Sequence, residues 1–287
     1  MKKVLSVLLA VIFLASLIGG CGNVRLAENE ITVVSREDGS GTRGAFVELF
    51  GLLETGADGT RKDTTYKEAI IANRTDVMMT TVANDANAIG YISLGSLNDT
   101  VKAVNIGGIK ASAANVKNGT YEVSRPFIIA VKGTATGLQK DFIDYILSAE
   151  GQAVVNERNY IAIDPDTPAY AGDSPAGKLT IAGSSSVSPL MEVLVERYNI
   201  INPNADIEIQ TTDSSAGMTA AINGTCEIGM SSRELKDSEK EVLKGMTIAI
   251  DGIAVIVNNT NPHGNLSKAQ VKEIFTGKIL RWNELVN

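Results

Sequence analysis

Cysteine and histidine are nearly absent from this sequence of 287 residues, which contains two cysteines and one histidine. Cys21 ends an N-terminal apolar segment, so Cys226 is the one cysteine left in the body of the chain and no disulfide can form there. His263 lies in the turn-like stretch Asn-Pro-His-Gly, with no second histidine or paired thiol to join it. These absences exclude the usual zinc sites, disfavour Ser-His-Asp or Cys-His catalysis, and predict a protein with no metal and no cofactor.

Positive charge is also in short supply, since 26 Lys and Arg residues stand against 33 Asp and Glu residues and the formal net charge is −7. Such an acidic chain disfavours nucleic acid and anionic membrane surfaces as its main partners. A small anionic ligand is not disfavoured, because nearby backbone N–H groups govern a buried site while distant surface charges are screened.

Residues 1–20 have the features of a targeting segment and not of a folded element. Two lysines open the segment, a run of apolar residues follows, and the pair Gly-Gly precedes Cys21. This pattern looks like a bacterial lipoprotein signal peptide that is cleaved before Cys21, whose thiol then carries lipid such as palmitate. A transmembrane helix is the alternative, and the run is short for one. We therefore expect a tether over residues 21–30 and a lipid anchor on the extracytoplasmic face of the cell membrane.

The first indication of a binding site is a short loop between a strand and a helix. A β-branched run at residues 31–34 predicts a buried strand, and apolar residues at helical spacing predict a helix over residues 42–53. The loop between them, residues 36–42, consists mainly of small residues. It can therefore point several backbone N–H groups and the positive end of the helix dipole at one spot.

Side chains in this loop suit a small tetrahedral oxyanion. Ser40 and Thr42 add hydroxyl donors, and Arg36 or Arg43 adds a full positive charge with bidentate geometry. The spacing is not that of a P-loop. A loop of this kind taken alone is most often only a helix cap, so the anion site depends on further loops elsewhere in the chain.

Strands and helices alternate through the rest of the chain, which is typical of an α/β fold. Helices are predicted over residues 64–83, 137–158, 189–199, 218–223 and 267–275. Strands are predicted over residues 88–93, 101–106, 127–131, 179–182, 206–210, 226–230 and 247–257. Residues 161–178 are rich in Pro and Gly and predict a linker, by default a domain boundary. Trp282 is predicted to anchor packing near the end of the chain.

Three more loops of small polar residues follow predicted strands, at residues 183–189, 211–217 and 231–234. In open α/β sheets the carboxyl ends of the strands face a crevice in which ligands bind, so four such loops predict one shared cleft. The apolar runs at 127–131 and 247–257 are then either hinge strands between two lobes or plain central strands, and the pattern leaves both open.

Five segments of the chain carry motifs that occur together. They are Val34-Ser-Arg-Glu-Asp-Gly-Ser-Gly-Thr-Arg43, Ala182-Gly-Ser-Ser-Ser-Val-Ser-Pro189, Thr212-Asp-Ser-Ser-Ala-Gly217, Ile228-Gly-Met-Ser-Ser-Arg-Glu-Leu235 and Ile274-Phe-Thr-Gly-Lys-Ile-Leu-Arg-Trp282. The set resembles the phosphate-binding proteins of bacterial phosphate ABC transporters, a class of two-lobed solute-binding proteins. In the familiar members the Arg-Glu-Asp-Gly-Ser-Gly-Thr segment follows the others, whereas here it comes first. The chain therefore resembles a circular permutant in which residues 161–178 join the ancestral termini.

The resemblance implies an α/β, periplasmic-binding-protein-like fold of type 2, with two open α/β sheets joined by hinge strands and a circularly permuted order. Lobe A is then contiguous over residues 133–251. Lobe B is split between residues 31–121 and 258–287, and the hinge strands cover residues 122–132 and 252–257.

The resemblance also implies that each lobe supplies part of a phosphate site. Lobe A offers Ser185, Ser186 and Ser214, and lobe B offers Arg36, Ser40, the backbone of Gly41 and Thr42. Ser232 is a further candidate of lobe A for the same phosphate site. Asp38 matches the family aspartate that pairs with the site arginine and holds its guanidinium in place. Arg43 is either an extra charge at the site or a surface residue of the first helical turn.

Ser232 departs from the family pattern, since the better-known members carry there an aspartate that accepts the proton of hydrogen phosphate. Asp213, Glu37 and Glu234 are the candidates for that role in this chain, and the sequence leaves the choice open.

The function implied is the capture of inorganic phosphate and its delivery to the permease subunits of an ABC transporter, without catalysis. One alternative is an anion sensor or signalling module on the same fold. A second is a serine hydrolase with Ser185 or Ser214 as nucleophile, for which His263 in a turn is a poor base.

Overall fold

The computed structural model describes residues 30–56, 60–163 and 167–285. The predicted signal peptide at 1–20, the lipidated Cys21 and the tether up to residue 29 therefore lie outside the described residues. Within the described ranges, no helix combines the length and the apolar character that a membrane span needs. Strands and helices alternate along the chain, which confirms the predicted α/β class.

The strands are β1 (Thr32–Arg36), β2 (Leu53–Thr55), β3 (Arg61–Asp63), β4 (Ile70–Ala72), β5 (Ala88–Ser93), β6 (Lys102–Ala103), β7 (Asn105–Ile106), β8 (Ser124–Lys132), β9 (Gly177–Ser184), β10 (Ala205–Thr212), β11 (Ile228–Ser231), β12 (Leu243–Val257) and β13 (Asn265–Leu266). The α-helices are α2 (Gly41–Leu49), α3 (Thr75–Asn84), α4 (Ala113–Lys117), α5 (Gly137–Ile146), α6 (Ala149–Glu157), α7 (Ser188–Ile201), α8 (Ser214–Asn223), α9 (Asp237–Lys240) and α10 (Lys268–Phe275). Two short 3-10 helices, η2 (Leu94–Ser96) and η3 (Trp282–Glu284), complete the described elements.

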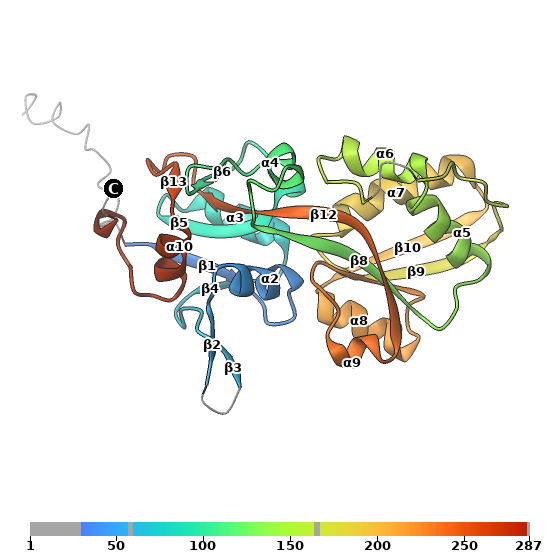
Figure 1. Ribbon diagram of the computed structural model, residues 1–287, viewed down its shortest axis with the longest axis horizontal. Coiled ribbons are helices and arrows are strands. Elements are labelled where there is room, and N and C mark those ends of the chain that lie inside the picture. Colours follow the sequence, from blue (N-terminus) through green and yellow to red (C-terminus); the bar gives the residue numbers. More distant parts are fainter. Residues whose placement is uncertain (1–29, 57–59, 164–166, 286–287) are drawn as a thin grey trace, which may run out of the picture.

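The main strands form one hydrogen-bonded path in the order β10-β9-β11-β8-β12-β5-β1-β4, and β6 pairs with β12 beside it. Strand β9 is parallel to β10 and β11, and β1 is parallel to β4 and β5. Between these two parallel groups, β8 and β12 run antiparallel to each other and to their outer neighbours. Figure 1 shows the result as two bodies that are bridged by β8 and β12.

Strand β12 belongs to both groups, because its first part pairs with β8 over residues 243–252 and its last part pairs with β5 over residues 253–257. The two sheets expected from the sequence are therefore continuous through this strand. The residue limits predicted for the lobes and for the hinge strands stay predictions.

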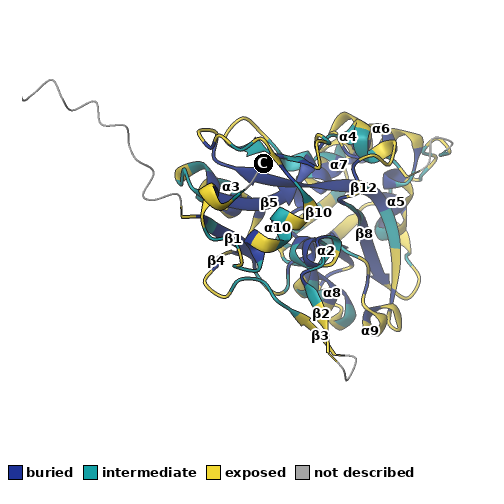
Figure 2. Cartoon of the chain, turned by 60° about the vertical axis from the view of Figure 1, so that its left-hand side comes forward, coloured by how far each residue is buried: buried dark blue, intermediate teal, exposed yellow. Residues whose placement is uncertain are grey.

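Each body has its own apolar core. One cluster gathers buried side chains from residues 31–123 and 253–282, and the body around it is called lobe B here. Two further clusters gather buried side chains from residues 127–249, and the body around them is called lobe A. Figure 2 shows β5, and the greater part of β8 and β12, in the colour of buried residues. Burial of this apolar surface is the main force that stabilises each lobe.

An aromatic cluster supports the sheet of lobe B close to the end of β1. Phe46 of α2 stacks on Tyr91 of β5 with ring centroids 3.9 Å apart, and Phe275 of α10 meets Phe46 edge-on at 4.7 Å. These rings fix α2, the helix that follows the first small-residue loop, against β5 and α10.

Two of the predicted helices are divided in the structure. The helix predicted over 64–83 is the strand β4 followed by α3, because residues 70–72 extend to pair with β1. The helix predicted over 137–158 is divided into α5 and α6. Ser148 causes the division, since its hydroxyl accepts the backbone N–H of Gly151 and donates to the carbonyl of Tyr145.

The prediction that Trp282 anchors packing is confirmed, since this residue is 4% exposed and its indole N–H donates to the carbonyl of Asn87 at 3.0 Å. His263 stacks on the indole with centroids 4.9 Å apart, and burial lowers the pKa of the imidazole. Asn87 precedes β5, at the amino ends of the parallel strands of lobe B. The chain's one histidine therefore lies at the opposite end of this sheet from Arg36, where it cannot act as base for the serine loops.

Arg125 and Asp251 form a buried ion pair where β8 and β12 leave lobe A. Arg125 Nη2 lies 3.1 Å from Asp251 Oδ2, and the two side chains are 2% and 1% exposed. Gly95 of lobe B donates its backbone N–H to the other carboxylate oxygen at 3.4 Å. Removing either partner would leave an uncompensated charge in the interior, so the pair is a fixed feature of the crossing point.

Burial raises the pKa of Asp251 from 3.8 to about 6, although the charge of Arg125 opposes the shift. Because the folded state holds this proton more tightly, the carboxyl stabilises the fold fully below its unfolded-state pKa, and that contribution is lost as the pH rises through about 6. A carboxyl-carbon NMR titration should show one aspartate titrating near pH 6. Asp76 is an internal reference, because hydrogen bonding and charge from Arg74 outweigh desolvation and lower its pKa. A titration of Asp251 near pH 4 would contradict the shift.

Candidate functional site

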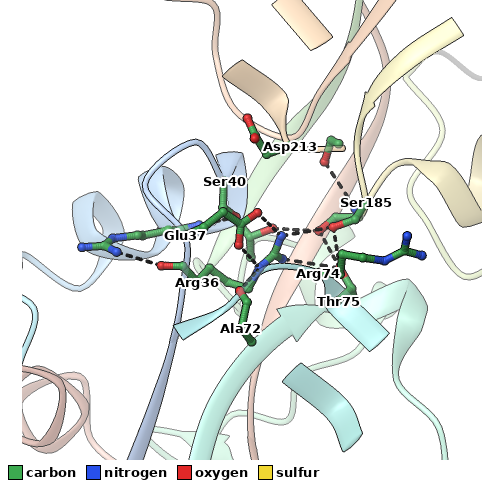
Figure 3. A network of polar contacts seen from close by, with 12 residues as sticks. Arg36, Glu37, Ser40, Ala72, Arg74, Thr75, Ser185 and Asp213 are labelled. Atoms are coloured by element: carbon green, nitrogen blue, oxygen red, sulfur yellow. Dashed lines mark hydrogen bonds and ion pairs between the residues drawn. The ribbon is translucent and has the colours of Figure 1, made fainter. Parts of the chain in front are cut away.

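The loops identified in the sequence lie together at the junction of the two lobes (Figure 3). Lobe B contributes the N-terminal ends of α2 and α3, and lobe A contributes those of α7 and α8. Ser40 caps α2 by accepting the backbone N–H of Arg43, and Asp213 caps α8 by accepting that of Ala216. Helix N-termini carry partial positive charge, so their convergence suits an anion.

Arg36 brings the full positive charge of the site to the end of β1. Its backbone N–H donates to the phenol oxygen of Tyr91 at 3.2 Å, and that oxygen lies 2.9 Å from the hydroxyl of Ser35. Burial raises the pKa of Tyr91, which keeps the phenol neutral. The guanidinium is buried with the residue 1% exposed, and its Nη2 donates to Ser185 Oγ of lobe A at 3.1 Å.

Glu37, and not Asp38, holds the guanidinium in place. The two carboxylate oxygens of Glu37 accept from Nε and Nη2 of Arg36 at 2.8 and 2.7 Å. Asp38 has a 95% exposed side chain and pairs with Arg43 at 3.0 Å. The prediction for Asp38 is therefore wrong. A turn closed by the Ser40 N–H on the Glu37 carbonyl directs Asp38 to solvent, while the longer Glu37 side chain reaches back to its neighbour.

Hydroxyl groups from the two lobes meet beside Arg36. Thr42 Oγ1 and Ser186 Oγ lie 2.8 Å apart. Thr75, at the start of α3, lies 3.2 Å from Ser186 Oγ and 3.4 Å from Ser185 Oγ. All of these residues are buried. The contacts connect lobe B to lobe A through side chains that can each bind an oxyanion.

A second group of hydroxyls lies within lobe A. Ser184 Oγ donates to Ser232 Oγ at 2.9 Å, and Ser214 Oγ lies 3.4 Å from Ser232 Oγ. Ser214 also accepts the backbone N–H of Ser232 at 3.1 Å. Ser214 and Ser232 are both fully buried, and they face Gly41 at the start of α2.

Two glycines of lobe B allow the backbone to approach lobe A closely. Gly39 accepts the backbone N–H of Ser215 through its carbonyl at 3.2 Å. A Cβ added to Gly41 would lie 2.4 Å from Ser214 Oγ and 2.7 Å from Ser232 Oγ, which is closer than side chains pack. Glycine is required here by this contact between lobes and not by an unusual backbone conformation.

Arg43 and Asp213, the two additional candidates, have other partners. Arg43 pairs with Asp63 at 3.0 Å and donates to the carbonyl of Arg36 at 2.7 Å. Burial alone would raise the pKa of Asp63, but bonds from Thr65 and Arg43 lower it on balance. The carboxylate of Asp213 points away from the Arg36 network (Figure 3). The guanidinium of Arg43 thus fixes the loop that follows Arg36, and the carboxylate of Asp213 caps the N-terminus of α8.

Sequence reasoning missed Thr75 and misplaced the partner of Arg36. Thr75 was hidden inside the helix predicted over 64–83, although a threonine followed by an aspartate is a recognisable helix start. A groove of about 430 Å³ runs between the lobes past Thr75 and Ser185 and is also lined by Arg74 and Arg158. No cluster of metal-ligating side chains occurs among the residues that the structure describes.

A body of two α/β lobes that meet over buried hydroxyls, helix N-termini and one guanidinium defines the class of two-lobed solute-binding proteins. A family model described as "PBP superfamily domain" matches residues 23–150 and 168–287. The chain belongs to this superfamily and, within it, to the family of phosphate-binding proteins called PstS.

Relatives of known name support the assignment. "Phosphate-binding protein PstS 2" of Streptococcus agalactiae is 49% identical over 273 residues, which cover 94% of this chain and 93% of the relative. The crystal structure of a phosphate-binding protein of a phosphate ABC transporter from Streptococcus pneumoniae TIGR4 is 45% identical, with a TM-score of 0.71, and covers 90% of this chain and 100% of that one. "Phosphate-binding protein PstS" of Bacillus subtilis is 36% identical over 113 residues, 38% of either chain.

Substituting Gly41→Ala should destabilise the contact between the lobes, because the added methyl group would overlap the hydroxyls of Ser214 and Ser232. Overpacking of this kind costs about 1–3 kcal/mol, which corresponds to a fall in Tm of roughly 2–10 °C by scanning calorimetry. Gly44→Ala is the matched control in the same helix, since its nearest neighbour would lie at an ordinary 3.5 Å. Equal Tm values for the two variants would refute the close contact at Gly41.

Proposed function

We propose that this protein captures inorganic phosphate between its lobes and delivers it to the permease subunits of an ABC transporter. The observation that carries the proposal is the hydrogen bond from Arg36 of lobe B to Ser185 of lobe A, in the middle of a buried set of hydroxyls from both lobes. The relatives support it, since their names describe phosphate-binding proteins and one belongs to a phosphate ABC transporter.

Proteins of this family bind and do not catalyse, and the binding energetics are reasonable. Micromolar affinity corresponds to about −8 kcal/mol. Eight or so charge-assisted hydrogen bonds at about 1.5–3 kcal/mol each exceed that value. The excess offsets dehydration of the anion and the ordering of the two lobes.

Division of the donors between the lobes links binding to closure. Arg36, Thr42 and Thr75 lie on lobe B, whereas Ser185 and Ser186 lie on lobe A. Only a closed cleft brings all of them to one anion, so phosphate shifts the open–closed equilibrium by its higher affinity for the closed form. A permease that contacts both lobes can then distinguish loaded from empty protein.

Anchoring follows from the N-terminal pattern, with Cys21 carrying lipid on the extracytoplasmic face of the membrane. Support comes from the charged start, the apolar run and the Gly-Gly-Cys ending. Cys21→Ala should move most of the protein from the membrane fraction to the soluble fraction, and Cys226→Ala, at a buried position, should not. A membrane-bound Cys21→Ala protein would contradict the anchor.

Circular permutation is the second structural part of the proposal. A relative with a different order of segments would align with this chain over one block only, and the alignment of the B. subtilis protein over 38% of either chain supports this reading. The proposed joint packs on lobe A, where Tyr170 donates to the carboxylate of Asp141. In the structure of the B. subtilis protein, the counterparts of β9–β11 should precede those of β1–β5. The same order as in this chain would refute the permutation.

Arg36→Ala should weaken phosphate binding by well over tenfold, because it removes a buried, charge-assisted contact. Isothermal titration calorimetry of the soluble chain with sodium phosphate measures the change. Arg61→Ala is the control, since Arg61 is exposed and pairs with Glu48 at the surface. An unchanged affinity of the Arg36 variant would exclude this residue from the site.

A further inference from the structure

The groove between the lobes adjoins the phosphate site and extends beyond it. Its volume of about 430 Å³ lies in the range of roughly 300–1,000 Å³ that is typical of small-ligand sites. Thr75 and Ser185 line the groove, and their hydroxyls also lie 3.5 and 3.1 Å from the guanidinium of Arg36. These two hydroxyls are therefore a shared wall, and a ligand held at Arg36 can extend past them into the groove.

Each lobe places one arginine on this groove. Arg74 is the residue before α3 of lobe B, and Arg158 follows α6 of lobe A. Figure 3 shows the side chain of Arg74 directed away from Arg36. The groove thus has two positive charges of its own, on the other side of the hydroxyl wall from the charge of the inner site.

Both of these guanidinium groups have donors to spare. Arg74 donates from Nε to Asp76 at 3.0 Å, which leaves its two terminal nitrogens. The side chain of Arg158 is exposed and makes no ion pair or hydrogen bond with the part of the chain that the structure describes. Because the planar guanidinium fork matches the oxygens of a phosphoryl group, each arginine can bind one without giving up a partner.

Neutral polar groups complete the lining with the same chemistry as the inner site. Ser188 opens α7, and its hydroxyl accepts from Thr211 at 2.9 Å. Ser96 of lobe B also lines the groove, and its hydroxyl oxygen is buried without a hydrogen-bond partner among the described residues. A buried hydroxyl of this kind is costly unless a ligand or water satisfies it.

Two carboxylates on the groove, Asp76 and Glu192, balance the charge of its two arginines. Such balance does not prevent anion binding, since the guanidinium of Arg36 is balanced by Glu37 in the same way. Glu192 is exposed, so solvent screens its repulsion of a ligand in the groove.

We propose that the groove is an outer anion subsite, so that the inner site and the groove together bind two linked phosphoryl groups, as in inorganic diphosphate. One phosphoryl group lies at Arg36 and the second at Arg74 and Arg158, with the hydroxyls of Thr75 and Ser185 between them. The inference rests on the proposed function, since it extends the same site.

The test is calorimetric titration of the soluble chain with sodium phosphate and, separately, with sodium diphosphate freed of orthophosphate, both in metal-free buffer. The wild-type protein should bind one diphosphate, with a Kd within about tenfold of that for phosphate. Phosphorus NMR of the complex should show two inequivalent resonances, because one phosphoryl group is buried and the other lies in the groove.

Variants of the two arginines test the subsite directly. Arg158→Gln and Arg74→Gln should each raise the Kd for diphosphate by about tenfold or more, since a charge-assisted hydrogen bond is lost, and should change the Kd for phosphate by less than about twofold. Arg61→Gln is the matched control, because this exposed arginine pairs with Glu48 away from the groove, and it should change neither value.

The outcomes separate the inference from the proposed function. Protein that binds phosphate but not diphosphate overturns the inference and leaves the proposed function intact. Failure to bind either anion overturns both. Equal losses of phosphate and diphosphate binding in the Arg158 variant would show that this arginine acts on the inner site or on the fold, and would refute the subsite. Diphosphate binding that is unchanged in both arginine variants would also refute it.

Discussion

The site depends on a buried positive charge that is neutralised within its own lobe. Arg36 is 1% exposed, and Glu37 accepts two hydrogen bonds from its guanidinium. A guanidinium in the interior is tolerated only when paired. Because the partner is the next residue in the chain, the charge stays compensated when lobe A moves away. The bond to Ser185 can then form and break with closure, without leaving an unpaired charge behind.

The two lobes touch closely at glycine residues of lobe B, and the long strand β12 connects them. Gly39 and Gly41 bring the backbone of lobe B against Ser215, Ser214 and Ser232. Strand β12 continues through both sheets, and the pair Arg125–Asp251 fixes it to β8 at the crossing point. In the closure proposed above, the two strands would bend near this pair, and the glycine contact would be the stop.

Much of the site was predictable because its chemistry follows from local sequence. Small residues after a strand predict helix N-termini, and the loops at 36–42, 183–189, 211–217 and 231–234 do lie together. The predictions that failed concern features that tertiary contacts determine. Glu37 and Asp38 are equivalent in a pattern, and only the turn at residues 37–40 decides which one reaches Arg36.

Thr75 and the split at Ser148 were missed for a related reason. Strand β4 forms because residues 70–72 pair with β1. The spacing of apolar residues in 64–83 does not indicate this pairing. Ser148 ends one helix and begins another through two hydrogen bonds, within a stretch whose apolar residues keep helical spacing on both sides. Periodicity reports which face is buried, and it does not report where a capping hydroxyl interrupts the helix.

Removal of the predicted signal peptide takes two lysines from the chain and leaves a formal charge of −9, yet the proposed ligand is an anion. Glu37 compensates the charge of Arg36 at a distance, so a bound anion is held at close range by the guanidinium, the hydroxyls and the helix N-termini, which act over a few ångströms. Surface charge is screened beyond about 8 Å at physiological ionic strength, so it neither attracts nor rejects the bound anion. Tight binding must therefore come from slow release out of a closed cleft, which is the state that Arg36–Ser185 and Thr42–Ser186 stabilise.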